Sequence, residues 1–274
     1  MSVQIEDLSF SYGSTPVLHG VTIGAARPGE VLGVVGPNAA GKSTLLKCMA
    51  GLLKSTGRVW FDQEEVVSSD HWRKLRRQVT YLPQEYASTA AITVFEAILV
   101  ARQQSASWMV GDDDIAAVAT IIDELRLEPI SLRYLSELSG GQRQMVAVAQ
   151  SLAREPRVLL LDEPTSSLDL QRQLELLQLV RSLAGERGMT VLIALHDLNL
   201  AARFVDRLVI MHQGKTFADG APHAVLTEPM LFNVYGIEAR VERDMDGLPR
   251  ITPLRSVRDA PTPAPERELA GVFA

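Results

Sequence analysis

The feature that most constrains this chain is a short apolar run followed at once by a glycine-rich loop and a helix. Residues 31–35 (Val-Leu-Gly-Val-Val) have the character of a strand buried in a sheet. Residues 36–44 then read Gly-Pro-Asn-Ala-Ala-Gly-Lys-Ser-Thr and match the pattern G-x-x-x-x-G-K-[ST]. Such a loop cradles phosphate, because its backbone N–H groups and the helix N-terminus point at the same anion. The chain is therefore expected to bind a nucleotide.

This loop supplies several kinds of contact to a bound nucleotide. Lys42 has the length to reach the β and γ phosphates, which also gives it an expected part in catalysis, and the hydroxyl of Ser43 is an expected Mg²⁺ ligand. The nucleotide-binding residues expected in the loop are Gly36, Pro37, Asn38, Ala39, Ala40, Gly41, Lys42, Ser43 and Thr44.

Two further apolar runs end in chemically useful side chains. Residues 158–161 are followed by Asp162 and Glu163, and residues 191–195 by His196. Beside a phosphate cradle, Asp162 is expected to hold Mg²⁺ and Glu163 to polarise a water for attack on the γ-phosphate. The alternative is an ordinary strand that ends in a solvated acidic turn. His196 would lie at the same edge of a parallel sheet.

Helical periodicity follows each apolar run, which predicts an α/β core with a covered parallel sheet. The expected helices cover residues 42–53, 142–154, 170–183 and 198–204. Segments 3–11, 17–23 and 58–61 are typical of an antiparallel edge. Between about residues 85 and 155, apolar residues recur at helical spacing, which indicates a helical subdomain inserted into the sheet domain.

Composition limits the classes of function. At about 150 residues per domain, 274 residues give one large domain or two modest ones. The 46% hydrophobic and 22% charged residues are typical of a globular protein rather than a fibrous or disordered one. The net charge of −6 would repel nucleic acid backbones and anionic lipid, so no nucleic acid partner is expected.

Three observations bear on where the chain works. Its one cysteine, Cys48, cannot form an internal disulfide, which favours a reducing cytoplasm. Residues 1–8 alternate like a strand rather than a signal peptide, so no export is expected. The longest apolar runs have five residues, as in 191–195, whereas a membrane span needs about 20. If this protein works at a membrane, another chain must supply the span.

A second glycine-rich turn identifies the family that the chain resembles. Residues 138–143 read Leu-Ser-Gly-Gly-Gln-Arg directly before a helical pattern, which again makes an anion-binding turn. This is the signature sequence of ATP-binding-cassette (ABC) ATPases, and the chain resembles them from about residue 3 to residue 235. The resemblance implies a P-loop NTPase fold of the ABC type over residues 1–236. Residues 237–274 would form a C-terminal extension, which becomes polar, Pro-rich and partly disordered after residue 255.

The resemblance also assigns roles to single residues. Tyr12 matches the aromatic residue that stacks on adenine, and Gln84 matches the Q-loop glutamine, which takes part in catalysis and metal binding. Asp169 matches the D-loop aspartate, and His196 the switch histidine. Two copies would pair head to tail, so that the signature turn of one chain closes over the γ-phosphate held by the other chain. The signature residues with this expected role are Ser139, Gly140, Gly141 and Gln142.

Two residues depart from the family pattern. Ala39 stands where many members have glycine, which would restrict the loop if that position needed a positive φ. Ser167 stands where alanine is commoner. Neither departure removes an expected ligand.

Among ABC proteins, the chain resembles the ATPase subunits of transporters. It has one cassette, no long coiled-coil insertion and no second signature. Such a subunit would dock on separate permease chains at the cytoplasmic face of a bacterial membrane, through residues from 84 to about 102. An extracytoplasmic substrate-binding protein would be an indirect partner. Segments 220–226, 234–236 and 139–144 look like the importers of ferric siderophores, haem and cobalamin, of which ferric siderophore is favoured.

Two other classes of protein remain as alternatives. One is a soluble ABC ATPase that acts on nucleic acid or ribosomes, which the net charge and the single cassette disfavour. The other is a P-loop kinase of small molecules, which would have no use for the turn at residues 138–142.

Overall fold

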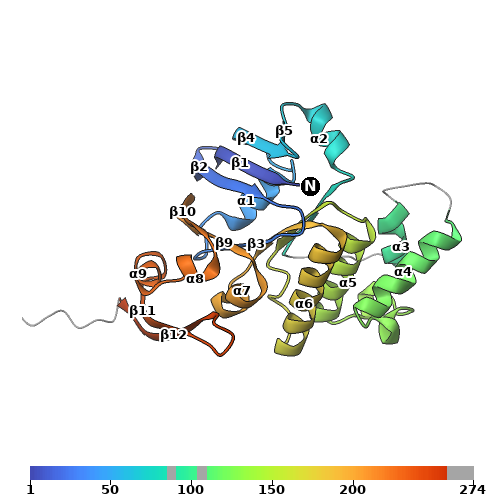
Figure 1. Cartoon of the computed structure of the whole chain (residues 1–274). Coiled ribbons are helices and arrows are strands. Elements are labelled where there is room, and N and C mark those ends of the chain that lie inside the picture. Colours follow the sequence, from blue (N-terminus) through green and yellow to red (C-terminus); the bar gives the residue numbers. More distant parts are fainter. Residues whose placement is uncertain (85–90, 104–109, 258–274) are drawn as a thin grey trace, which may run out of the picture.

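The computed structural model describes residues 1–84, 91–103 and 110–257, and its centre is a mostly parallel sheet (Figure 1). Within these residues the strand order is β10-β9-β3-β8-β7-β6, with β10 antiparallel to β9 and the others parallel. The strands are β3 (Val31–Val35), β6 (Val79–Leu82), β7 (Val158–Asp162), β8 (Thr190–Ala194), β9 (Arg207–His212) and β10 (Lys215–Gly220). All residues of β3, β7 and β8 are buried, as the continuous apolar runs predict.

A second, antiparallel sheet with the strand order β2-β1-β4-β5 lies beside the first (Figure 1). Its strands are β1 (Val3–Tyr12), β2 (Thr15–Ala26), β4 (Thr56–Phe61) and β5 (Glu64–Glu65). Helix α1 (Lys42–Met49) packs with β1, β2 and one face of the central sheet in a single apolar cluster. The mixed α/β fold with an antiparallel sheet, predicted from the sequence, is confirmed.

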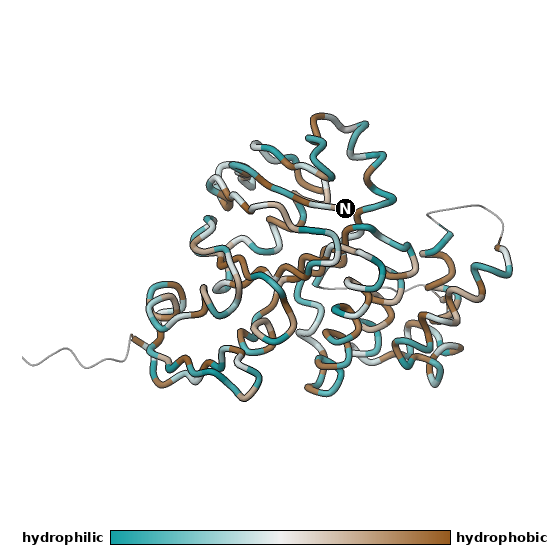
Figure 2. The backbone as a smooth tube through the Cα atoms, viewed as in Figure 1, coloured by the Kyte–Doolittle hydropathy of each residue, from teal (hydrophilic) through white to brown (hydrophobic). Residues whose placement is uncertain are grey.

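The other face of the central sheet packs against helices. They are α3 (Val94–Gln103), α4 (Asp112–Glu124), α5 (Gly140–Ala153), α6 (Leu170–Arg187) and α7 (Leu198–Phe204), with the short 3-10 turns η1 (Glu128–Ile130) and η2 (Leu135–Glu137). A separate helix, α2 (Ser69–Leu75), follows β5. Figure 2 shows the hydrophobic central strands running between the helices and the antiparallel sheet. No helix of the described segments is long and apolar enough to cross a membrane.

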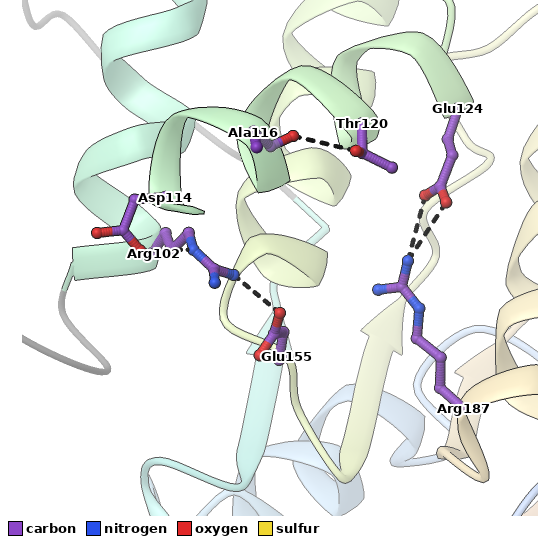
Figure 3. A network of polar contacts seen from close by, with 7 residues as sticks. All are labelled: Arg102, Asp114, Ala116, Thr120, Glu124, Glu155 and Arg187. Carbon is purple, nitrogen blue, oxygen red and sulfur yellow. Dashed lines mark hydrogen bonds and ion pairs between the residues drawn. The ribbon is translucent and has the colours of Figure 1, made fainter. Parts of the chain in front are cut away.

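Helices α3, α4 and α5 follow one another between β6 and β7, in the region where the sequence predicts a helical subdomain. Residues 85–90 and 104–109 of that region lie outside the described residues. Figure 3 shows the polar contacts that join α3 to α4 and to Glu155 after α5, and α4 to the end of α6. Arg102 of α3 pairs with Asp114 of α4 at 2.8 Å and with Glu155 at 2.9 Å. Arg187, at the end of α6, reaches Glu124, at the end of α4, at 3.3 Å.

Between β10 and residue 257, the described residues form three short helices and a hairpin. These elements are α8 (Pro222–Val225), α9 (Glu228–Met230), the π-helix η3 (Leu231–Tyr235), β11 (Ile237–Arg243) and β12 (Pro249–Ser256). The side chain of Asn199 in α7 binds the hairpin at both backbone groups of Ile251: its Oδ1 accepts from the N–H at 2.8 Å, and its Nδ2 donates to the carbonyl at 3.2 Å. The predicted disorder after residue 255 concerns mainly residues 258–274, which lie outside the described residues.

Several predicted helix bounds were wrong, and the caps explain why. The helix predicted over 42–53 ends at Met49, because Gly51 takes a left-handed φ of 67°. The helix predicted from 142 begins at Gly140, because Ser139 caps it. The helix predicted to end at 183 continues to Arg187, where Gly188 in the left-handed region ends it. Strands β5, β6, β9, β10, β11 and β12 were not predicted.

The loop between β3 and α1 has a backbone that most side chains would not fit. A Cβ on Gly36 would lie 2.2 Å from the carbonyl oxygen of Met211, so only glycine fits there. Gly41 has a φ of 98° and directly precedes α1. Ala39 is exposed and has a φ of 62°, so this position does take the left-handed conformation that favours glycine.

Removing the asparagine contact to the hairpin should loosen the C-terminal region. Asn199→Ala loses two hydrogen bonds to backbone, which should lower the free energy of unfolding by about 1–3 kcal/mol. Hydrogen exchange should quicken in residues 237–256 while β3 stays protected. Asn233→Ala, at an exposed position in η3, is the control and should change stability by less than about 0.5 kcal/mol. Unchanged exchange in the hairpin would contradict this account.

Replacing Ala39 with glycine should stabilise the protein. A non-glycine residue in the left-handed region costs about 1–2 kcal/mol. Glycine loses more chain entropy on folding than alanine, which costs about 0.5–1 kcal/mol. The expected net gain in stability is therefore about 0.5–1 kcal/mol. The free energy of unfolding in urea measures it. The control is Ala40→Gly at the next residue, which is buried and has a negative φ and should therefore destabilise. Equal effects of the two changes would count against strain at Ala39.

Candidate active site

Most of the residues predicted to hold the nucleotide meet at the carboxyl edge of the central sheet, around a pocket of about 490 Å³. Gly36, Pro37 and Asp162 are not part of its lining. Because β3, β7 and β8 are parallel, the loop after β3, the acids at the end of β7 and the histidine after β8 all open onto one edge. The pocket is lined by Tyr12, Val17, Asn38, Ala39, Ala40, Gly41, Lys42, Ser43, Thr44, Gln84, Glu163 and His196.

Lys42 is the buried cation of the pocket, with 5% of its surface exposed. Its ammonium donates to the carbonyl of Gly36 at 2.9 Å and to that of Pro37 at 3.3 Å, and it lies 3.9 Å from Oε1 of Glu163. Burial lowers the pKa of Lys42, although the nearby carboxylates of Glu163 and Asp162 act in the opposite direction. The loop carbonyls thus hold a positive charge at the floor of the cradle.

Asp162 joins three elements of the site. Its Oδ1 accepts from the hydroxyl of Ser43 at 2.9 Å, and its Oδ2 accepts from the hydroxyl of Tyr81 at 2.9 Å. Asp162 is only 2% exposed. Burial, and the adjacent Asp162 carboxylate, raise the pKa of Tyr81 well above its usual range. Tyr81 was not among the predicted site residues, although it lies on an apolar segment three residues before Gln84.

Glu163 and His196 form the shortest side-chain contact described at the site. Oε1 of Glu163 lies 2.6 Å from Nε2 of His196, and Glu163 is 6% exposed. Glu163 has a φ of 51°, and its carbonyl accepts from the N–H of Ser166 at 3.2 Å. A non-glycine residue in this conformation is held by its surroundings, as at many functional sites. The turn therefore aims a buried carboxylate into the pocket, within reach of an imidazole.

Tyr12 and Gln84 line the open side of the pocket. Tyr12 ends β1 and is 48% exposed. The edge-to-face contact of its ring with Phe10, at 4.8 Å between ring centroids, supports the ring from within the same strand. Gln84 is exposed and follows β6 by two residues.

The signature residues and Asp169 do not line this pocket, as far as the described residues show. Ser139 caps α5: its N–H donates to the side chain of Gln142 at 2.9 Å, and its Oγ accepts from the N–H of Gln142 at 3.3 Å. A Cβ on Gly140 would meet open space, whereas one on Gly141 would lie 3.1 Å from the carbonyl of Ser167. Asp169 caps α6 through the N–H of Arg172 at 2.9 Å. Within one chain, the two glycine-rich turns therefore stay separate.

The oxygen ligands at the pocket fit a hard divalent cation that arrives with a nucleotide. Ser43 offers a hydroxyl and Asp162 a carboxylate, which Mg²⁺ prefers over nitrogen or sulfur ligands. Among the described residues, no cluster of three or more His, Cys, Asp or Glu side chains could hold a metal on its own. Phosphate oxygens would have to complete the coordination shell.

Comparison with known proteins agrees with this geometry. Residues 20–166 match the ABC transporter family. The petrobactin import ATP-binding protein FpuC of Bacillus anthracis is 39% identical over 235 residues, which is 84% of this chain and 85% of that protein. The hemin import ATP-binding protein HmuV of Rhodopseudomonas palustris is 37% identical over 257 residues, which is 89% of this chain and 94% of that protein.

Solved structures show the same fold. A metal-chelate type ABC transporter in an inward-facing conformation superimposes with a TM-score of 0.78 at 26% identity, covering 93% of this chain and 98% of that one. The ATP-binding cassette MJ0796, a dimer bound to ADP and Pi, gives a TM-score of 0.73 at 27% identity, covering 80% of this chain and 98% of that one. The chain therefore belongs to the ABC transporter family as an ATP-binding subunit, and it is an ATPase.

Proposed function

We propose that this chain powers the import of a ferric siderophore or a related iron chelate through separate permease subunits. The observation that carries the ATPase chemistry is the contact of buried Glu163 with both Lys42 and His196 at the edge of the phosphate cradle. The import of an iron chelate is supported by the relatives, which include the petrobactin and iron(3+)-hydroxamate import proteins. Haem import is the second candidate, favoured by several hemin import relatives, HmuV of Vibrio cholerae among them.

In the proposed mechanism, the loop at residues 36–44 binds the phosphates of ATP through its backbone N–H groups and Lys42. Tyr12 stacks on the adenine. Ser43 and Asp162, with Gln84 on the open side of the pocket, hold Mg²⁺, which when bound neutralises charge on the phosphate oxygens.

Glu163 is the proposed general base. Its carboxylate is buried, and its Oε1 faces the ammonium of Lys42 at 3.9 Å and the imidazole of His196 at 2.6 Å. A carboxylate in this position accepts a proton from a water that attacks the γ-phosphate in line. The contact with His196 orients that carboxylate. The imidazole of His196 is partly exposed, which leaves it free to contact the phosphate.

We propose that a second copy completes each site. The pocket is open, and within the described residues the signature turn of the same chain does not line it. Gly140 faces open space, so a phosphate could approach the backbone there. The residues that the partner would contribute are Ser139, Gly140, Gly141, Gln142 and Asp169. The similar MJ0796 cassette forms a dimer, which supports this arrangement.

A second pocket, of about 230 Å³, supports a docking place for a permease. It lies where the end of β6 meets α3 and α5, and it is lined by Leu82, Pro83, Val100 and Gln150 among others. Val100 is 48% exposed, and Pro83 of the pocket directly precedes Gln84 in the sequence. The docking surface expected over residues 84–102 includes 85–90, which lie outside the described residues. The complex would work at the cytoplasmic face of the membrane and receive its cargo from an extracytoplasmic binding protein.

Replacing the proposed base should stop turnover without stopping binding. Glu163→Gln keeps the shape of the side chain but cannot accept the proton, so ATP hydrolysis should fall by at least about 100-fold. ATP binding, measured by calorimetry, should persist, and the variant should form a dimer with ATP. Glu65→Gln, at an exposed position in β5, is the matched control and should hydrolyse ATP like the unaltered chain. Undiminished hydrolysis by Glu163→Gln would remove Glu163 from this role.

Partner capture should identify the transport system. The full-length tagged chain, extracted from native membranes in mild detergent, should bring down permease subunits. Vesicles that contain this complex and its binding protein should then accumulate a ferric siderophore only when ATP is supplied. Uptake of haem in place of the siderophore would move the proposal to the second candidate. Capture of ribosomal or DNA-repair proteins alone would overturn the transporter function and leave the ATPase chemistry standing.

A further inference from the structure

Both oxygens of the Asp162 carboxylate are held by hydroxyl groups from different elements. Ser43, in the first turn of α1, donates to Oδ1 at 2.9 Å, and Tyr81 of β6 donates to Oδ2 at 2.9 Å. Asp162 is 2% exposed, so water has little access to it. Two donors on opposite sides fix the plane of the carboxylate as well as its position.

The strand register explains how Tyr81 reaches the carboxylate. Strands β6 and β7 are parallel neighbours, and Tyr81 pairs with Leu160. Alternate residues of a strand share a face, so Leu160 and Asp162 point to the side of the sheet that α1 covers. Leu160 belongs to the apolar cluster on that side, and Tyr81 packs against this cluster. The ring is therefore anchored by packing while its hydroxyl extends along the sheet edge to Asp162.

We propose that Tyr81 is a positioning residue, which holds Asp162 so that Oδ1 faces Ser43 and the nucleotide pocket. This inference rests on the proposed function, in which Ser43 and Asp162 ligate Mg²⁺. A carboxylate oxygen has more than one lone pair, so an oxygen that accepts a hydrogen bond from a hydroxyl can still bind a cation. Hydrogen bonds from neighbours to metal ligands orient those ligands, and losing one typically weakens metal affinity by about 10–100-fold.

The test removes only the hydroxyl. Tyr81→Phe keeps the ring in the apolar cluster but leaves Oδ2 of Asp162 without its donor. The affinity of Mn²⁺ for the chain loaded with a non-hydrolysable ATP analogue, measured by electron paramagnetic resonance, should fall by about tenfold or more. The Mg²⁺ concentration that half-saturates ATP hydrolysis should rise to a similar extent. Binding of the same analogue without metal, in EDTA, should stay within about twofold of the unaltered chain.

A control is available on the same strand. Thr80 is 3% exposed and faces the opposite side of β6, and its hydroxyl has no hydrogen-bond partner among the described residues. Thr80→Val also removes one buried hydroxyl from β6, and it should leave Mn²⁺ affinity unchanged.

Each outcome decides the inference. Unchanged Mn²⁺ affinity in Tyr81→Phe overturns it. So does a Tyr81→Phe chain that loses metal-free nucleotide binding, or that melts far below Thr80→Val, because Tyr81 would then have a structural role only. An unaltered chain that shows no metal-dependent ATP hydrolysis would contradict the proposed function instead, so the two failures are distinguishable.

Discussion

The parallel pairing of β3, β8 and β7 is the constraint on which the site depends. Each strand is buried on both faces, so its polar groups can appear only where it ends. Parallel direction brings those ends to one edge, which places the loop of Lys42 beside Glu163 and His196. Lys42 and Glu163 are more than a hundred positions apart in sequence, and they thereby come within 4 Å of each other.

Charge balance then defines what the pocket accepts. A buried ammonium and two buried carboxylates lie close together at the edge of the pocket. In the structure, the loop carbonyls and Glu163 satisfy Lys42. A polyanion would supply negative groups for the ammonium, and its divalent cation would supply a positive group for the carboxylates. The pocket therefore matches a metal-bound nucleotide better than a free anion.

The sequence predicts much of this arrangement, and the residues show why. Strong local patterns, such as the loop at 36–44 and the apolar run before Asp162, identify the strands and ligands that carry the chemistry. Strand β6 was not predicted because Thr80 interrupts its short apolar run, and its pairing with β7 depends on contacts 79 positions away in sequence. Tyr81 was not predicted for the same reason, since its contact with Asp162 depends on strand register. Helix bounds were misplaced where a single cap, such as Gly51 or Ser139, decided them.

The cap at Ser139 has a consequence for how two copies would attract each other. Its oxygen accepts from the N–H of Gln142, so the hydroxyl proton remains to be donated outward. Ser139 and the backbone N–H groups of this turn are neutral, and the guanidinium of Arg143 donates to the turn's own carbonyl of Leu138 at 2.8 Å. The attraction of the neutral donors for a phosphate would act only at contact distance and would vanish once that phosphate left. The affinity between copies would then follow the state of the nucleotide, because the neutral donors of this turn would attract the other copy only through a bound phosphate.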